Sequence, residues 1–361
     1  MRAFIDECLD RVLAGGKISI DEGERLLNAG PSDFMHLLAA ASRVRLHFIG
    51  DEVHLCSIVN AKSGRCSEDC GFCSQSSQFT TGVEEYDLLP EGQASVAGKE
   101  ARSHGAEALG LVAAWRGLKQ GKQLDAVIER VREVSQDGAV HADASLGLID
   151  DPEVARQLKE AGLHTYNHNL ETARSHFDEV VASHDYDERL QTLKIVRDAG
   201  IHLCSGGIVG MGESLRQRAE LAAELREVDP DMVPLNFLNP IEGTPMAEQH
   251  EPMAAIDALK CIAMFRMMLP GHQIMVAGGR EVVLGDLAPL MYMAGASATM
   301  VGNYLTTSGT PAGQDVSTIR ALGLSLRTDG RSDLPESPRP LKRVGEETEP
   351  TSSEQTLVAG A

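Results

Sequence analysis

Short apolar runs alternate along the chain with longer stretches in which apolar residues recur at every third or fourth position. Short runs of this kind are typical of buried strands, and the longer spacing is typical of amphipathic helices. The expected strands are Val53–Asn60, Ala108–Ala114, Ala139–Leu146, Leu163–Asn169, Ile201–Gly210, Met232–Asn239, Gln273–Ala277 and Ala298–Asn303. The expected helices are Gln123–Val134, Pro152–Ala161, Tyr186–Asp198, Leu215–Val228, Ala254–Met268 and Leu284–Met293.

The residues that flank these helices support their boundaries. Asp185 and Ser214 stand where a helix begins, and Gly162 and Gly200 stand where one ends. Strand–helix alternation repeated about eight times is typical of a parallel barrel of roughly 250 residues. A doubly wound open sheet is the alternative, but it calls for a glycine-rich phosphate loop after the first strand, where this chain has cysteines. We therefore predict the α/β class, with a (β/α)8 TIM-type barrel.

The same pattern divides the chain into three segments. Residues 1–46 are expected to form an N-terminal helical extension of one or two helices, with breaks at Gly15-Gly16 and Gly30-Pro31. Residues 47–327 are expected to form the barrel. Residues 328–361 are rich in Pro, Ser, Glu and Thr and have little apolar content, so a disordered tail without a catalytic role is expected there.

Composition and charge narrow the possible function classes. A net charge of −20 would repel the phosphates of nucleic acid, and no run approaches the roughly 18 apolar residues of a membrane span. Acids near Met1 occupy positions where a signal peptide needs cations. The seven cysteines lack the spacing of a disulfide scaffold, which favours a reducing compartment. We expect a cytoplasmic enzyme that binds neither nucleic acid nor membrane.

Three closely spaced cysteines, Cys66, Cys70 and Cys73, follow the first expected strand. Four-iron clusters are usually held by four cysteines, so three thiolates would leave one iron open to a small molecule. The spacing differs from the paired two-residue spacing of common structural zinc sites. A zinc site with a distant fourth ligand, or buried cysteines without metal, remain the alternatives.

Other polar residues cluster at the ends of expected strands, where barrel enzymes place their chemistry. Asn167 and Asn169 lie on the same face of a strand and could bind an amide-like or urea-like group, or could cap the next helix. Cys204 precedes two glycines, which either permit close approach to a ligand or form a tight strand end. Trp115, the only tryptophan, follows the second strand and is by itself more often a core residue.

The cysteine run resembles the cluster loop of radical S-adenosylmethionine enzymes, and further segments resemble the biotin synthase family. These segments lie between about residues 50 and 325. They are Asn60-Ala61-Lys62-Ser63-Gly64, Cys73-Ser74-Gln75-Ser76, Tyr166-Asn167-His168-Asn169-Leu170, Cys204-Ser205-Gly206-Gly207-Ile208-Val209-Gly210, Asn236-Phe237-Leu238, Gly243-Thr244-Pro245, Gly278-Gly279-Arg280-Glu281 and Gly302-Asn303-Tyr304-Leu305-Thr306-Thr307. The Tyr-Asn-His-Asn run is the most specific of them.

The resemblance implies a [4Fe-4S] cluster on Cys66, Cys70 and Cys73, whose open iron is chelated by S-adenosyl-L-methionine. It implies cleavage of that cofactor to a 5′-deoxyadenosyl radical and sulfur insertion into dethiobiotin. It also implies a reducing electron-transfer protein as partner, a homodimer, and a biotin- and thiamin-synthesis-associated part at about residues 230–325. The expected cofactor contacts are Phe72, Trp115, Gly206, Gly207 and Glu213, and the expected substrate contacts are Asn167, Asn169 and Asn236.

The second cluster of this family, a [2Fe-2S] sulfur donor, usually has three cysteines and an arginine as ligands. Alignment on the shared motifs places these four positions at Gly110, Asp143, Cys204 and Met275. Glycine has no side chain and methionine is a poor ligand for ferric iron. Cys204 with Asp143, helped by His141, is the remaining candidate set. Cys8, Cys56 and Cys261 are expected to lie elsewhere.

Two enzyme hypotheses therefore stay open. In the first, the chain is a biotin synthase-like sulfurtransferase with an altered sulfur donor. In the second, it is a radical enzyme of the same lineage that rearranges, cleaves or epimerises another small molecule without inserting sulfur. A non-catalytic iron–sulfur or metal-binding module is a third class, but such a module would need no polar interior at the fourth and sixth strands.

Overall fold

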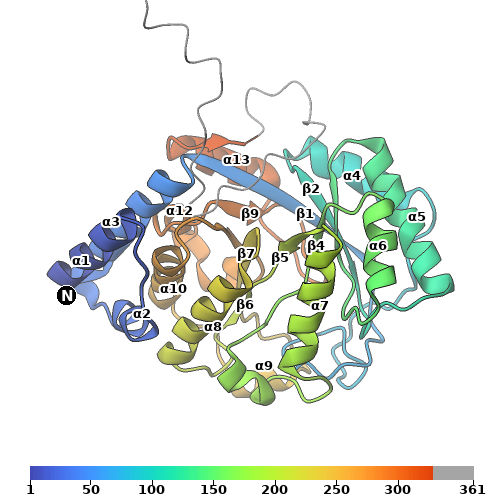
Figure 1. Cartoon of the computed structure of the whole chain (residues 1–361), viewed down its shortest axis with the longest axis horizontal. Coiled ribbons are helices and arrows are strands. Elements are labelled where there is room, and N and C mark those ends of the chain that lie inside the picture. Colours follow the sequence, from blue (N-terminus) through green and yellow to red (C-terminus); the bar gives the residue numbers. More distant parts are fainter. Residues whose placement is uncertain (328–361) are drawn as a thin grey trace, which may run out of the picture.

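The strands close into a parallel barrel in the computed structural model, which describes residues 1–327 (Figure 1). Neighbouring strands around the barrel are β1, β2, β3, β4, β5, β7, β8 and β9, and β9 pairs with β1. β6 follows β5 in the same place in the barrel wall and also pairs with β7. β10 pairs with the start of β1. The strands are β1 (Glu52–Lys62), β2 (Ala108–Ala113), β3 (His141–Ser145), β4 (Thr165–Asn167), β5 (His202–Cys204), β6 (Gly207–Val209), β7 (Met232–Phe237), β8 (Gln273–Val276), β9 (Ala298–Met300) and β10 (Ser325–Leu326). The predicted (β/α)8 fold is confirmed.

Helices surround this barrel, and the N-terminal helices pack beside α8 and α10 (Figure 1). The α-helices are α1 (Arg2–Leu13), α2 (Ile20–Leu27), α3 (Pro31–Phe48), α4 (Gln93–Ser103), α5 (Lys122–Asp137), α6 (Pro152–Glu160), α7 (Tyr186–Asp198), α8 (Leu215–Val228), α9 (Pro245–Gln249), α10 (Ala255–Met268), α11 (Arg280–Val283), α12 (Leu290–Met293) and α13 (Ala312–Ala321). Two short 3-10 helices are η1 (Arg174–Glu179) and η2 (Gly285–Leu287). Among residues 1–327, no helix combines the length and apolar character needed to cross a membrane.

Local sequence signals account for several helix ends. Asp185 and Ser214 form capping boxes at the starts of α7 and α8, as predicted. Gly162 and Gly200 follow α6 and α7 with positive φ angles, which glycine adopts without steric cost. The tail prediction lies outside the described residues.

Two helix predictions are corrected by the structure. The expected helix Leu284–Met293 is broken, because Gly285 has a positive φ and Pro289 directly precedes α12. The N-terminal extension contains three helices rather than one or two, since each predicted break separates two helices.

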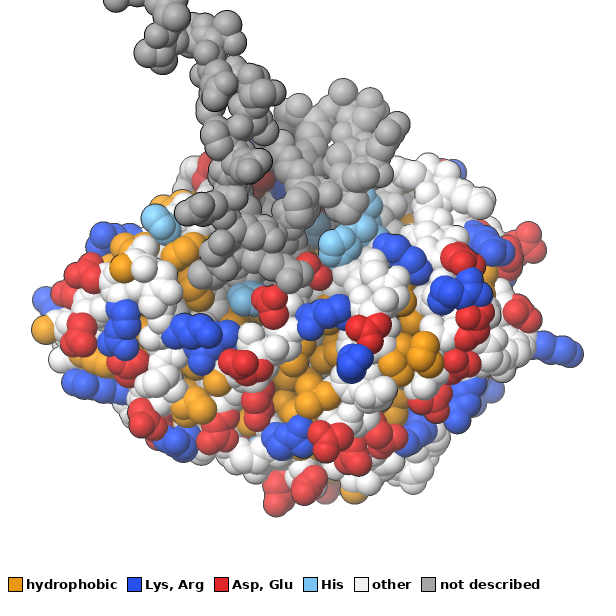
Figure 2. Space-filling model, viewed as in Figure 1, with side chains coloured by type: hydrophobic (Ala, Val, Ile, Leu, Met, Phe, Trp, Pro, Cys, Tyr) orange, Lys and Arg blue, Asp and Glu red, His pale blue; other side chains and the backbone are white. Residues whose placement is uncertain are grey.

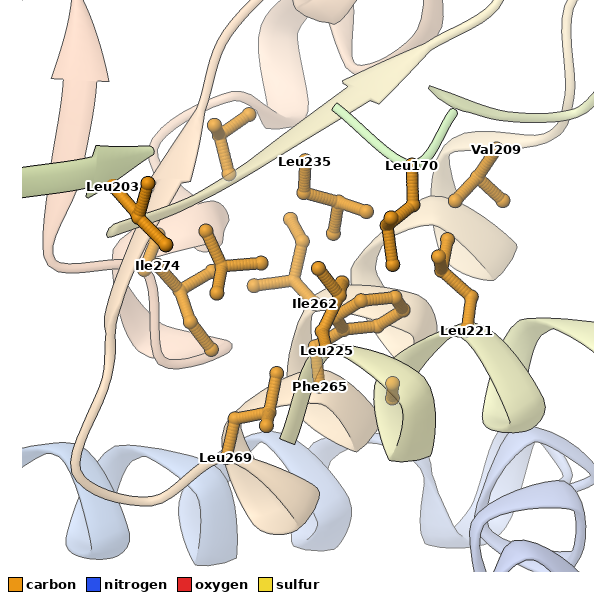
Figure 3. Close-up of a cluster of buried hydrophobic side chains, with 14 of the residues drawn as sticks. Leu170, Leu203, Val209, Leu221, Leu225, Leu235, Ile262, Phe265, Leu269 and Ile274 are labelled. Carbon is orange, nitrogen blue, oxygen red and sulfur yellow. The ribbon is translucent and has the colours of Figure 1, made fainter. Parts of the chain in front are cut away.

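The main core lies between the barrel wall and the surrounding helices. Figure 3 shows part of it, where leucine, valine and isoleucine side chains from the strands meet leucine, isoleucine and phenylalanine side chains of α8 and α10. Charged side chains of both signs are interspersed over the face in Figure 2, so the net charge of −20 is not gathered into one patch there. A smaller cluster lies inside the barrel and is rich in sulfur and small residues: Cys56, Ala108, Cys204, Met232, Met275, Ala277, Ala298 and Met300.

One buried arginine, Arg266, secures the end of α10. Its guanidinium donates hydrogen bonds to five oxygens, which belong to Gly295, Leu269, Pro270, His272 and Ser297. Burial, with a smaller effect of Arg45, lowers the pKa of Arg266 to about 9. These bonds satisfy carbonyl groups that would otherwise be buried without donors.

We expect Arg266→Met to lower the free energy of unfolding by about 3 kcal/mol, because several buried carbonyls lose their donor. The urea midpoint, followed by circular dichroism, measures this. Arg156→Met is the matched control, since Arg156 is on the surface of α6 and should change stability by less than about 0.5 kcal/mol. Equal midpoints for the two variants would contradict this account of Arg266.

Candidate active site

The three predicted cluster ligands line one cavity at the carboxyl end of the barrel strands. Cys66 is buried, Cys70 and Cys73 are half-buried, and all three face a space of about 1160 Å³. The walls of this cavity come from the loop after β1 and from the ends of β2, β3, β4, β7 and β8. The position agrees with the end of the barrel at which this fold carries its chemistry.

The cysteine loop is held in shape by its own backbone. The Cys66 amide donates to the carbonyl of Gln75, and the Ser77 amide donates to the carbonyl of Cys66. The Gln75 side chain accepts hydrogen bonds from the side chain of Asn60 and the amide of Gly64, both at 3.2 Å. These bonds tie both ends of the loop to the end of β1, so the thiols are positioned before any ligand arrives.

A buried carboxylate fixes the same loop to the segment before α7. Glu68 lies 2.5 Å from His184 Nδ1 and accepts a hydrogen bond from Ser183 Oγ at 2.8 Å. Arg116 forms an ion pair with it at 3.2 Å. Burial raises the pKa of Glu68, but these hydrogen bonds and the nearby charges outweigh that effect and the pKa is lowered. The carboxylate is therefore ionised and holds the loop at neutral pH.

The protein interior around the three thiols disfavours their thiolate forms when no cationic group is bound. Burial raises the pKa of all three, to about 11 for Cys73, so the free thiols are protonated at neutral pH. A bound cationic group would stabilise the thiolate forms. Among the described residues, no three His, Cys, Asp or Glu side chains converge on a single metal ion. Three thiols spaced around one cavity fit a polynuclear iron–sulfur cluster better than mononuclear zinc.

The predicted substrate residues Asn167, Asn169 and Asn236 all line this cavity. Asn169 accepts from the Gly206 amide, and Asn236 accepts from the Gly278 amide. Within residues 1–327, Asn167 Oδ1 is buried without a hydrogen-bond partner. The alternative that Asn167 and Asn169 cap the next helix is wrong, since η1 follows Ala173 and α7 is capped by Asp185.

Two of the predicted cofactor contacts lie on the cavity wall. Phe72 and Trp115 both line the cavity, and the Trp115 indole donates to the Leu146 carbonyl at 2.7 Å. Phe72 also lines a neighbouring space of about 880 Å³. That neighbouring space is bounded by Asn236 and by the loops after β7, β8 and β9.

The remaining predicted contacts, Gly206, Gly207 and Glu213, are accounted for by packing within the protein. A Cβ atom on Gly206 would lie 1.9 Å from the carbonyl oxygen of Pro234, so only glycine fits between β5 and β7. Glu213 accepts hydrogen bonds from the amides of Gly210 and Met211. None of the three lines the cavity of the cysteine loop or the neighbouring space of about 880 Å³, and their contact with a cofactor stays a prediction.

Two charged residues of this cavity are not singled out by the sequence pattern. Arg189, buried on α7, donates to the Asn169 carbonyl at 2.8 Å and lies 3.4 Å from Glu171. Burial raises the pKa of Glu171, against the charge of Arg189. Glu171 is the last of the polar residues after β4, and its place at a strand end is a sequence signal for a cavity residue. Arg189 reaches the cavity only through the docking of α7, which no local pattern reveals.

A second cavity of about 710 Å³ lies deeper in the barrel, toward the amino ends of the strands. The four positions aligned with the usual second cluster all line it: Gly110, Asp143, Cys204 and Met275. Only one of them is a thiol, so the usual ligand set of three cysteines and an arginine does not fit. Cys56 lines this cavity too, and the prediction that it lies elsewhere is wrong because its position along β1 points inward.

Comparisons with known proteins agree with this geometry. A model of the Radical SAM superfamily matches residues 61–225, and a model of the Biotin and Thiamin Synthesis associated domain matches residues 234–325. The chain is 45% identical over 326 residues to a protein named biotin synthase from Geobacter metallireducens, covering 90% of this chain and 98% of the relative. It is 46% identical over 324 residues to a protein of the same name from Geobacter sulfurreducens, covering 90% and 98%.

Solved structures share the fold at lower sequence identity. Methylornithine synthase superposes with a TM-score of 0.77 at 20% identity, covering 88% of this chain and 97% of that one. The FeFe-hydrogenase maturase HydG from Carboxydothermus hydrogenoformans gives 0.74 at 16% identity, covering 89% and 78%. At this level of identity the similarity concerns the fold alone.

Proposed function

Because the chain belongs to the biotin synthase family of radical S-adenosylmethionine enzymes, we propose that it inserts sulfur into dethiobiotin to form biotin. The observation that carries the proposal is the single cavity in which three thiols, two aromatic side chains and three asparagines meet. A dethiobiotin-sized substrate would lie in this cavity between Asn167 and Asn236 and extend into the adjoining space beside Phe72.

In this proposal Cys66, Cys70 and Cys73 hold the [4Fe-4S] cluster, and one iron remains free for S-adenosyl-L-methionine. When bound, the cluster and this cofactor would supply a 5′-deoxyadenosyl radical, the species able to remove hydrogen atoms from unreactive carbon. The electron comes from a reducing partner protein. A homodimer, a cytoplasmic location and the absence of nucleic-acid or membrane partners remain part of the proposal.

The protein's own residues bind and orient the two small molecules. Arg189 places a buried positive charge in the cavity, and Glu171 places a carboxyl group there. These two groups can bind the charged ends and the hydroxyl groups of the cofactor. Phe72 and Trp115 offer flat apolar surfaces to the adenine. The buried walls exclude water, which would otherwise compete for a reactive intermediate.

The asparagines suit a cyclic urea, which carries one carbonyl acceptor and two N–H donors. Asn167 Oδ1 is a buried acceptor without a partner among residues 1–327, so it is available to an N–H group. Asn236 already binds the Gly278 amide through its oxygen, and its amide group lies 3.3 Å from the Gly207 carbonyl. We therefore assign Asn167 the more direct role and Asn236 a role in shaping the pocket.

The test is an anaerobic assay of the reconstituted protein with reductant, S-adenosyl-L-methionine and dethiobiotin. We expect both 5′-deoxyadenosine and biotin, measured by liquid chromatography and mass spectrometry. Absence of 5′-deoxyadenosine from protein with an intact cluster would contradict the radical function. The alternative is a radical enzyme of the same lineage that does not insert sulfur. It is favoured because three of the four usual second-cluster ligands are missing. It predicts formation of 5′-deoxyadenosine without biotin.

Asn167→Ala is expected to reduce biotin formation about tenfold, which corresponds to the loss of one buried hydrogen bond to the substrate. The effect should appear mainly in the KM for dethiobiotin. Asn28→Ala, a change at the exposed end of α2, is the control and should leave the kinetics unchanged. An unaltered KM in Asn167→Ala would remove Asn167 from the proposed substrate site.

A further inference from the structure

The cavity inside the barrel brings together two free thiols that are far apart in sequence. Cys56 on β1 is 7% exposed and Cys204 on β5 is 2% exposed, and both line the same space. Around the closed barrel β1 and β5 are separated by four steps in either direction, so the two thiols come from opposite walls. Neither is paired in a disulfide.

Asp143 and Met275 complete one layer with these thiols. The four side chains come from the alternate strands β1, β3, β5 and β8, which is how a single layer of a barrel interior is built. The strand pairings agree with this arrangement. A barrel with a shear of eight rises by about one residue per strand. With this rise, the pairings lead from Cys56 around the barrel to Asp143, Cys204 and Met275.

We propose that Cys56 and Cys204 are the thiolate ligands of a second iron–sulfide group inside the barrel, with Asp143 as a third, oxygen ligand. This proposal rests on the proposed sulfur-inserting function and replaces the usual ligand set, which the chain lacks. Thiolates are the standard ligands of iron–sulfur clusters, and a carboxylate is a hard donor that binds iron.

The immediate surroundings of the layer support a polynuclear group rather than a single ion. Asp143 Oδ1 is buried without a hydrogen-bond partner among the described residues, and its nearest cation-forming group is His164 at 3.6 Å. No three His, Cys, Asp or Glu side chains within residues 1–327 converge on one point, so a single metal ion does not fit. Ligands from opposite walls can instead be bridged by a group of several atoms.

The position of this layer suits a sulfur donor. Ile58, Asn167, Met275 and Met300 line both the inner cavity and the cavity of the cysteine loop. The two spaces therefore adjoin, and a sulfide held between Cys56 and Cys204 would lie directly beneath the substrate. On the opposite side, the stacked rings of His141, His164 and His202 border the inner cavity, with centroids 4.5 and 4.7 Å apart.

The test compares iron and acid-labile sulfide per chain after anaerobic reconstitution with ferrous iron and sulfide. We expect the wild type to bind clearly more than the roughly four irons of one [4Fe-4S] cluster. Cys56→Ala and Cys204→Ala should each fall to about four, with the Mössbauer signal of the first cluster retained. Cys8→Ala, which removes a buried thiol in the N-terminal extension, is the control and should match the wild type.

Cys56→Ser and Cys204→Ser keep the size of the side chain and guard against loss of fold, which circular dichroism would reveal. Full iron and sulfide in folded Cys56→Ala and Cys56→Ser would overturn the proposal. A wild type that makes biotin with only about four irons would also overturn it, while leaving the proposed function in place. A wild type that makes neither biotin nor 5′-deoxyadenosine would instead contradict the proposed function.

Discussion

Replacement of Cys70 by alanine is expected to abolish formation of 5′-deoxyadenosine, by at least about 10³-fold. Cys70 lines the main cavity with Cys66 and Cys73, and residues 1–327 place no fourth cysteine there. A cluster held by only two thiolates would be lost or would lack the single open iron that the cofactor needs. The assay is 5′-deoxyadenosine per chain under reducing, anaerobic conditions, together with bound iron.

Cys261→Ala is the matched control for this experiment. Cys261 is buried in α10 beside Arg218, on the outer side of the barrel wall, and its loss should leave radical formation at the wild-type rate. Continued production of 5′-deoxyadenosine by Cys70→Ala, at more than a few per cent of wild type, would contradict the assignment of the three cluster ligands.

The second large effect is expected from Cys204→Ala, which should separate radical formation from sulfur insertion. The thiol of Cys204 lies in the inner cavity and does not line the cavity of the cysteine loop. We expect 5′-deoxyadenosine to form still, while the ratio of biotin to 5′-deoxyadenosine falls by at least about 10²-fold. Both products are measured in the same reaction, so the ratio does not depend on protein concentration.

The double variant Cys56→Ala/Cys204→Ala sharpens this result. If both thiols serve one sulfur donor, the double variant should be no worse than either single variant, because the donor is already lost. Strictly additive losses, or an unchanged ratio of products in Cys204→Ala, would show that the inner thiols do not supply the sulfur.

The barrel could be predicted from the sequence because its strands and helices carry local signals. Each strand is a short apolar run and several helices begin at a side-chain cap, such as Asp185 and Ser214. The interruptions depend on longer-range contacts. The fifth strand is split into β5 and β6, where Gly206 is pressed against the Pro234 carbonyl of β7, and this contact is invisible in a local pattern.

The candidate site divides in the same way. Cys66, Cys70 and Cys73 are close in sequence, so their spacing alone predicted that they bind one metal cluster. Cys56 and Cys204 are brought together only by closure of the barrel. Cys56 and Ile58 are two residues apart on β1 and both line the inner cavity. Since residues two apart share one face of a strand, this spacing predicts that Cys56 points into the barrel if Ile58 does.

The most direct test of the central claim, that this protein inserts sulfur drawn from its own barrel, is the isotope content of the product. The protein is reconstituted with iron and ³⁴S-sulfide, freed of unbound sulfide, and given reductant, S-adenosyl-L-methionine and dethiobiotin. The account predicts biotin carrying ³⁴S, at no more than about one per chain, because the donor is consumed. Formation of 5′-deoxyadenosine without biotin, or biotin free of the label, would contradict it.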